Sequence, residues 1–445
     1  MRICLNTPDY SSTMSGTPEQ THPQTSSRWI AIEGIALVIA TPFLFFPEFL
    51  PFATLAALLA LGILWLASIK TIVLPATPFN LILVFWGIAL MVGIMVSADP
   101  ADTLPKATGA ILGLAVWRFL VISLQNARHV SLAVVVLLLT GIALSFLGIA
   151  SLDGLTKIPV LANFNPFQST LFSGLGGHIN QVGGLICLFL PLLVSMSIFP
   201  PPEFRRVAPR AILITATLLV TLILILSQSR SGWIGSAFGC FLLLVLWALI
   251  SPDSRHRRIL RLAASAFVIS MFVGIVWIGP SRILDLWLNP PRETTIGTLT
   301  TLNYRKVLWP WAVEAVNDFP FTGIGLGAFR QVIPRIYPIS MGPDVDISHA
   351  HNIFLQTALD VGLPGLIVYL ALLFVALAVG WRVARHDNDF RPISIGLVCG
   401  LVAVHIFGLV DAQVIGSKPG IILWFSLGLL AAMNKIVFPP AQSDS

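Results

Sequence analysis

The chain alternates between long apolar stretches and short polar connections. Twelve of these stretches are about twenty residues long, which is enough for a helix to cross the hydrocarbon core of a bilayer. They cover residues 29–47, 51–69, 79–97, 107–125, 130–150, 178–199, 209–227, 231–250, 259–279, 352–381, 392–411 and 419–438. The pattern predicts an all-α, polytopic membrane helical bundle of about twelve transmembrane helices. The largest polar connection lies between the ninth and tenth helices.

The composition supports a membrane protein. Hydrophobic residues make up 56% of the chain and charged residues only 10%, whereas about a quarter of an ordinary soluble domain is charged. Backbone polar groups inside lipid must pair within their own segment, which favours helices. The net charge of +6 does not indicate a nucleic-acid partner, because the positive charges lie between apolar segments. We therefore expect membrane lipids, and no nucleic acid, as the surroundings of this chain.

The distribution of Lys and Arg predicts the orientation, because positive charges are enriched on the cytoplasmic side. Of the 26 positive residues, six lie in the long connection. Four more lie in short connections on the same side: Lys106, Lys157, Arg230 and Lys418. The remaining sixteen fall on the other side or in the tails. Both termini are thus expected in the cytoplasm, and the long connection outside.

Five segments follow from this topology. They are a disordered cytoplasmic tail over 1–28, helices one to nine over 29–279, an outer catalytic loop over 280–351, helices ten to twelve over 352–438, and a second cytoplasmic tail over 439–445.

The outer loop is the part of the chain most suited to chemistry. Loops longer than about fifteen residues are usually functional or disordered, and this one has too many Trp, Leu and Ile residues for a linker. Within it, Tyr304 to Phe319 predicts an amphipathic helix, bent or interrupted at Pro310. Gly323, Gly325 and Gly327 predict a tight turn or a close approach of backbone. The charges of the loop cancel: Arg282, Arg292, Arg305, Lys306, Arg330 and Arg335 oppose Asp285, Glu293, Glu314, Asp318, Asp344 and Asp346.

Two arginines on the outer side are candidate anion ligands. Arg230 opens the eighth helix, with Ser229 or Ser231 as a capping residue. Backbone N–H groups at a helix start together with a guanidinium make a phosphate site. The alternative for Arg230 is an interface anchor that reaches the lipid headgroups. For Arg305, the alternative is a solvated charge on the amphipathic helix.

His349 and His351 are candidates for proton transfer. An extended His-x-His pair can hold a metal because alternate residues share a face, whereas helical geometry turns the two rings apart. We interpret one imidazole as a general base at the outer surface. The alternative is that both histidines only cap and anchor the helix that begins near Asn352.

A second polar group enters the sixth helix from the outer side. It consists of His178, Asn180 and Gln181, and polar residues at this depth usually face the interior of a bundle. We expect them, with Asn352, to line a cavity or to bond between helices. His405 in the eleventh helix and Asp411 at its outer end are similar.

Four motifs, in this order and on one side of the membrane, resemble the O-antigen ligase and polymerase superfamily of bacterial inner membranes. They are Ser227-Gln228-Ser229-Arg230 at a helix start, Arg305 with Trp309, the turn from Gly323 to Phe329, and His351-Asn352-Ile353-Phe354-Leu355 continuing to Gly362 and Gly365. The topology is also similar to that of the C-type glycosyltransferases.

The resemblance implies a glycosyltransferase whose donor is a glycan on undecaprenyl diphosphate at the periplasmic face. The acceptor hydroxyl would belong to the lipid A core, to a growing glycan, or to a protein. Carried over by motif, Arg230 and Arg305 would bind the diphosphate and His351 would deprotonate the acceptor, with His349 as the second choice. No metal and no cofactor are expected, and transfer should invert the anomeric carbon.

Four functions remain in competition at this stage. The first is a ligase that attaches O-antigen to the lipid A core. A polymerase or a protein O-oligosaccharyltransferase would use the same chemistry with another acceptor. A secondary transporter is disfavoured, because transporters carry ionisable groups near the membrane midplane in two related halves. Here the polar residues gather on one side instead.

Overall fold

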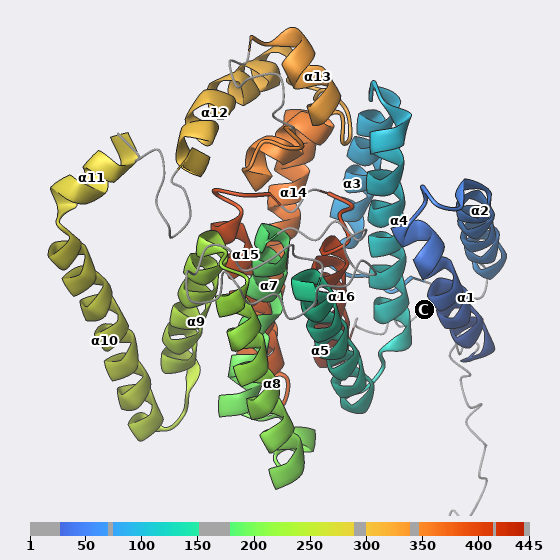
Figure 1. The fold of residues 1–445 in the computed structure, drawn as a ribbon. Coiled ribbons are helices and arrows are strands. Elements are labelled where there is room, and N and C mark those ends of the chain that lie inside the picture. The colour runs from blue at the N-terminus through green and yellow to red at the C-terminus, as the bar shows by residue number, and fades with distance from the viewer. Residues whose placement is uncertain are drawn as a thin grey trace, which may run out of the picture.

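A computed structural model describes residues 27–69, 74–150, 179–288, 300–338, 347–412 and 415–439. Within these ranges every regular element is helical (Figure 1). The helices are α1 (Ser27–Phe45), α2 (Pro51–Ser68), α3 (Asn80–Met95), α4 (Pro100–Ser123), α5 (Ala127–Ala150), α7 (Ile179–Ile198), η2 (Pro202–Phe204), α8 (Val207–Leu226), α9 (Arg230–Ile250), α10 (Ser254–Ile278), α11 (Pro280–Leu288), α12 (Thr300–Asp318), α13 (Phe329–Ile336), α14 (Ile353–His386), α15 (Arg391–Phe407) and α16 (Gly420–Val437).

The prediction of a polytopic helical membrane bundle is confirmed. Each predicted span corresponds to one helix of the sets α1–α5, α7–α10 and α14–α16. Ten of these helices are long and apolar enough to cross a membrane, and α3 and α15 are shorter apolar helices. Two helix boundaries differ from the predicted ones. Helix α4 begins at Pro100, because the Asp99 side chain accepts from the N–H of Ala101 at 2.8 Å and caps it. Helix α15 ends at Phe407, before Asp411.

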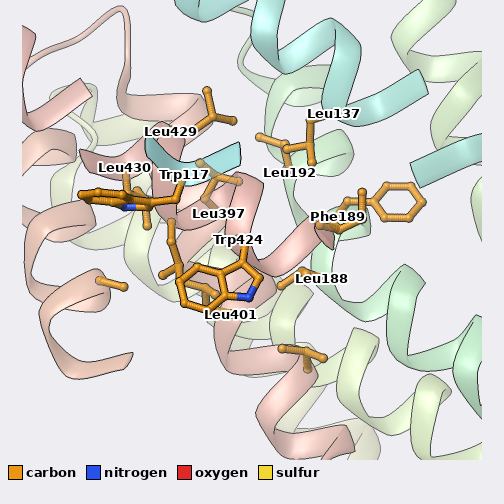
Figure 2. Packing of buried hydrophobic residues seen from close by; sticks show 14 of the residues in the cluster. Trp117, Leu137, Leu188, Phe189, Leu192, Leu397, Leu401, Trp424, Leu429 and Leu430 are labelled. Atoms are coloured by element: carbon orange, nitrogen blue, oxygen red, sulfur yellow. The ribbon is translucent and has the colours of Figure 1, made fainter. Parts of the chain in front are cut away.

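The centre of the bundle is formed by α7 and α15, which pack closely along their length. Phe189 and Leu192 of α7 belong to the same apolar cluster as Leu397 and Leu401 of α15 (Figure 2). A Cβ at Gly400 would lie 1.9 Å from the carbonyl oxygen of Leu188. Small residues therefore let these two backbones approach, as is common between helices in membranes.

The outer helices present apolar side chains to their surroundings. In α10, which stands at one edge of the bundle (Figure 1), Ile269, Phe272 and Val273 are all exposed. Helices α1 and α2 stand at the opposite edge and are similarly exposed. Surfaces this apolar need lipid rather than water around them. The exposure pattern therefore agrees with a membrane-embedded bundle.

The long polar connection folds over one end of the bundle. It contains α11, α12 and α13, and the last two lie beside the start of α14 (Figure 1). Helix α12 runs through Pro310 without interruption, and it buries Leu308, Ala312 and Ala315 against α13 and α14. The predicted amphipathic helix is therefore present. Its apolar face packs on protein.

The glycine turn after α12 docks on two helices. Gly323, Gly325 and Gly327 all have positive φ, at 66°, 105° and 75°, which only glycine adopts readily. This backbone path lets Ile324 N–H donate to the Leu359 carbonyl and Leu326 N–H donate to the Gly93 carbonyl, both at 2.8 Å. The predicted tight turn is confirmed, and it fixes α12 and α13 to α3 and α14.

The alternation of helices generates a topology prediction. Alkaline phosphatase fused after Thr322 should be active in a bacterial host, because the enzyme folds only after export. The same fusion after Asp387 should be inactive, and green fluorescent protein at the C-terminus should fluoresce. Phosphatase activity measured on whole cells at matched expression tests this. The reverse pattern at both fusion sites would show that the orientation is wrong.

Candidate functional site

A buried carboxylate joins four elements at the end of the bundle that carries α12 and α13. Asp411 follows α15, and its Oδ2 accepts a hydrogen bond from Nδ2 of Asn180 at the start of α7. The guanidinium of Arg305, from α12, lies 3.9 Å from the same oxygen. Nδ1 of His351, just before α14, lies 3.5 Å from Oδ1. We call these four residues, together with Ser229, which donates to Oδ1 of Asn180, the Asp411 cluster.

Asp411 and Arg305 are buried from solvent. Asp411 is 3% exposed and Arg305 is 8% exposed. Burial alone would raise the pKa of Asp411, but the neighbouring imidazoles of His351 and His349 outweigh this effect, so the net pKa lies below the ordinary value. Asp411 is therefore a carboxylate at neutral pH. A buried carboxylate is tolerated only when cations and donors surround it, which is what these side chains provide.

The start of α9 is held against the cluster by Ser229. Its hydroxyl oxygen accepts from the N–H of Gly232 at 3.3 Å and caps α9, and the same hydroxyl donates to Oδ1 of Asn180 at 3.1 Å. A Cβ at Gly232 would lie 2.9 Å from the Cα of Gly183, so two glycines allow the first turns of α7 and α9 to touch. Arg230 is the first residue of α9. The predicted cap is confirmed, and Arg230 stands one residue from the cluster.

Both backbone polar groups of Ala350, the residue between the two histidines, are hydrogen-bonded to side chains. The indole N–H of Trp309 donates to the carbonyl of Ala350 at 3.0 Å, and the N–H of Ala350 donates to Oε1 of Gln356 at 2.8 Å. Gln356 in turn donates to Oδ1 of Asp360 at 2.9 Å. His351 has a φ of +48°, a region uncommon for residues other than glycine. Clamped neighbours are what such a conformation requires.

The hydrogen bonding of the two histidines differs. The N–H of His351 donates to Nδ1 of His349 at 3.1 Å, and the two ring centroids lie 4.1 Å apart. A neutral His349 that accepts at Nδ1 carries its proton on Nε2. His351 directs Nδ1 at a carboxylate, which favours the proton on Nδ1 and the lone pair on Nε2. On this assignment the lone pair of His351 lies on Nε2, whereas His349 carries a proton there.

Comparison with known proteins bears on the same segment. Residues 214–370 match the family model described as O-antigen ligase. The resemblance found in the sequence is thereby confirmed. Exopolysaccharide production protein ExoQ of Rhizobium meliloti (strain 1021) is 27% identical to this chain over 222 residues. That match covers 48% of this chain and 49% of ExoQ, so the chain spans about half the length of this curated relative.

The matched residues 214–370 include Arg230, Arg305, His349 and His351. Of these, the structure brings Arg305 and His351 to one carboxylate, with His349 against His351. The carboxylate itself lies beyond the matched residues. The Asp411 cluster therefore combines residues inside the matched range, such as Arg305 and His351, with Asn180 and Asp411 outside it.

The other residues predicted for the site lie in different places. Asn180 belongs to the Asp411 cluster, whereas Gln181 lines a separate cavity described below. Asn352 caps α14 by accepting from the N–H groups of Phe354 and Leu355, and its amide donates to the Leu409 carbonyl at 3.0 Å. His178 lies outside the described residues. His405 bonds between helices, 2.8 Å from the hydroxyl of Tyr369.

Gln356 was not among the residues singled out in the sequence, and Asp411 was expected only to line a cavity or to bond between helices. The sequence places Asp411 at the end of an apolar stretch, where it resembles an ordinary helix terminus. Gln356 lies on the buried side of α14 and is 2% exposed. The only signal for either residue was a polar side chain at the outer end of an apolar span.

Gln356 generates the first prediction from this site. Replacing it with alanine leaves the Ala350 N–H without its acceptor and removes a donor to Asp360, which should cost about 1–3 kcal/mol for each buried group. Gln356→Ala should therefore lower the thermal unfolding temperature in detergent. The matched control is Gln331→Ala on α13, where the amide contacts only an exposed arginine, Arg335. Equal shifts for the two variants would contradict the clamp.

Metal binding is the second prediction. One ligand atom each from His349, His351 and Asp411 lies within 4.8 Å of the others, which is a spacing that suits an ion. Arg305, however, already lies 3.9 Å from the same carboxylate, and a divalent ion there would face its charge. Purified protein incubated with Zn²⁺ or Mn²⁺ and then dialysed should hold far less than one equivalent by elemental analysis. One equivalent that disappears in His349→Ala would show a metal site.

Proposed function

We propose that this protein is a membrane glycosyltransferase that moves a glycan from undecaprenyl diphosphate to an acceptor hydroxyl at the periplasmic face of the inner membrane. The first candidate is an O-antigen ligase, for which the acceptor is the lipid A core. The observation that carries the proposal is that Asp411 brings Arg305, an anion-binding group, and His351, a base, to one buried point. The family match over residues 214–370 supports the same chemistry.

The donor diphosphate is assigned to Arg230 and Arg305. Breaking the bond between the sugar and the diphosphate builds negative charge on the leaving oxygen, and cations fixed beside it lower the barrier. Arg305 is held by packing of α12 and by Asp411. Arg230 adds its guanidinium to the N–H groups in the first turn of α9, where the helix dipole favours an anion. Arg305 and the first turn of α9 are therefore fixed before the donor arrives.

His351 is assigned as the general base and Asp411 as its positioning residue. The acceptor oxygen attacks the anomeric carbon while its proton passes to Nε2 of His351, and the bond to the diphosphate oxygen breaks with its electron pair. One displacement inverts the anomeric centre. Asp411 directs Nδ1–H and stabilises the imidazolium that forms, as the carboxylate does in Ser-His-Asp sites. His349 stays the second choice for the base, with its Nδ1 already accepting from His351.

A second candidate has the same donor and a different acceptor. The similar protein ExoQ is named for exopolysaccharide production, which favours a polymerase that extends a lipid-linked glycan. A polymerase would use the same arginines and the same base, because only the acceptor differs. The choice between ligase and polymerase therefore depends on which lipid carries the product.

Expression in a bacterium that lacks its own ligase, but makes the donor and the core, tests the proposal. Wild type should restore a banded lipopolysaccharide ladder on a gel. Arg230→Ala and Arg305→Ala should each reduce transfer about 10²- to 10³-fold, and His351→Ala about 10²- to 10⁴-fold. Asp411→Asn should reduce transfer about 10- to 100-fold, which is the rate effect of losing one charge-assisted hydrogen bond. The exposed Arg335→Ala serves as the matched control and should transfer normally.

The outcomes separate the candidates. If wild type gives no ladder but the undecaprenyl-linked pool grows into long chains, the enzyme is a polymerase. If His349→Ala loses transfer and His351→Ala keeps it, the base has been assigned to the wrong histidine. Wild-type ladders from Arg230→Ala and Arg305→Ala would overturn the diphosphate site itself. Blotting each variant for its level in the membrane excludes loss of expression as the cause.

A further inference from the structure

A polar cavity lies against the connection between α15 and α16. It has a volume of about 230 Å³ and is lined by residues of α1, α4, α7 and that connection. Its polar lining includes Glu48, Lys106, Gln181, Ser417 and Lys418. Neither the family match nor the reaction proposed above gives this cavity a role. Asp411 and Lys418 lie in the same connection, but none of the residues that line the cavity belongs to the Asp411 cluster.

The cavity is built by a close contact of two backbones. A Cβ at Gly109 of α4 would lie 1.9 Å from the carbonyl oxygen of Gly416, and a Cβ at Gly416 would lie 1.8 Å from the carbonyl oxygen of Lys106. Gly416 also has a φ of +72°, which other residues rarely adopt. The connection is thereby pressed onto α4. This contact sets Ser417 and Lys418 beside Lys106.

The polar groups of the cavity suit an anion. Nζ of Lys418 lies 3.9 Å above the ring of Phe46, and burial lowers its pKa while the charge of Glu48 raises it. The Ser417 hydroxyl is buried and has no hydrogen-bond partner among the described residues. The carboxylates of Asp102 on α4 and Asp360 on α14 lie near Lys106. Two lysines and a hydroxyl donor are typical ligands of a phosphate, which lysine binds as a point charge.

The apolar lining suits a lipid. The large apolar side chains of the wall are Leu44, Phe45, Leu112 and Ile421. Helix α1 also exposes large apolar side chains such as Ile35 and Val38 on its outer face. A volume of 230 Å³ equals that of roughly eight water molecules, which is enough for a phosphate with a short attached group. A soluble anion would make no use of these apolar walls. A lipid headgroup uses both kinds of lining.

We propose that this cavity binds the phosphate of a membrane lipid headgroup, with Lys418, Lys106 and Ser417 as ligands. The lipid tail lies along the apolar wall next to α1. The site stands independently of the transfer reaction, since none of its residues belongs to the Asp411 cluster. Binding there would fix the connection that carries Asp411 at one end and Lys418 at the other.

Native mass spectrometry of the purified, delipidated chain tests the proposal. Titration with phosphatidylglycerol should show one retained lipid, and diacylglycerol, which lacks the phosphate, should not be retained. Lys418→Gln and Lys106→Gln should each weaken retention about tenfold, the effect of one charged ligand. Ser417→Leu fills the cavity without changing its charge and should also lose the lipid. Arg335→Gln, which removes an exposed positive charge elsewhere, should retain it.

Three results would overturn the proposal. One is equal retention of diacylglycerol, and another is equal retention by Lys418→Gln with an unchanged unfolding temperature. The third is displacement of the lipid by millimolar inorganic phosphate, which would assign the site to a free anion. Arg230→Ala should keep the lipid whether or not it transfers glycan, so failure of the proposed reaction and failure of this site give different results.

Discussion

The outer end of this protein depends on one buried carboxylate. Asp411 carries its charge in a place that is 3% exposed, and an unpaired charge there would be strongly destabilising. Its partners come from α7, from α12 and from the peptide before α14. Because the partners are far apart in the sequence, the carboxylate can be satisfied only when these elements have all docked. The docking of the loop therefore satisfies the buried charge of Asp411 and also assembles the side chains of the proposed site.

The backbone contributes a second constraint through glycine. Close contacts at Gly232, Gly400 and Gly416 bring α7, α9, α15 and α4 together, and the positive φ angles from Gly323 to Gly327 dock the loop on α3 and α14. Helices in lipid gain little from hydrophobic association, so close packing and hydrogen bonds between segments must hold them. The same contacts fix the first turns of α7 and α9, and with them Asn180, Ser229 and Arg230.

Much of the fold follows from the sequence, because a membrane imposes a simple pattern. Apolar length alone located twelve apolar helices among the described residues, ten of them long enough to cross a membrane, and Ser229 before Arg230 gave the cap of α9 correctly. The assembly of the cluster did not follow. Residues 408–411 read as the apolar end of a helix, although α15 stops at Phe407. The contact of Asp411 with Arg305 and His351 joins distant segments, and neither periodicity nor capping signals carry such information. The resemblance supplied the two arginines and the histidines, but it gave no carboxylate to orient them.

The division of labour between the histidines follows from the same carboxylate. The ring of His349 accepts a hydrogen bond from the backbone of His351, so its remaining nitrogen carries a proton and serves as a donor. His351 directs Nδ1 at Asp411, which leaves its lone pair on Nε2. In the proposed transfer the imidazole becomes positive, and Asp411 would then face two cations, the imidazolium and Arg305. Arg305 lies 3.9 Å from Asp411, which is the distance of an ion pair and not of a hydrogen bond. As negative charge grew on the proposed leaving diphosphate, Arg305 would stabilise that charge, while Asp411 would stabilise the new charge on His351.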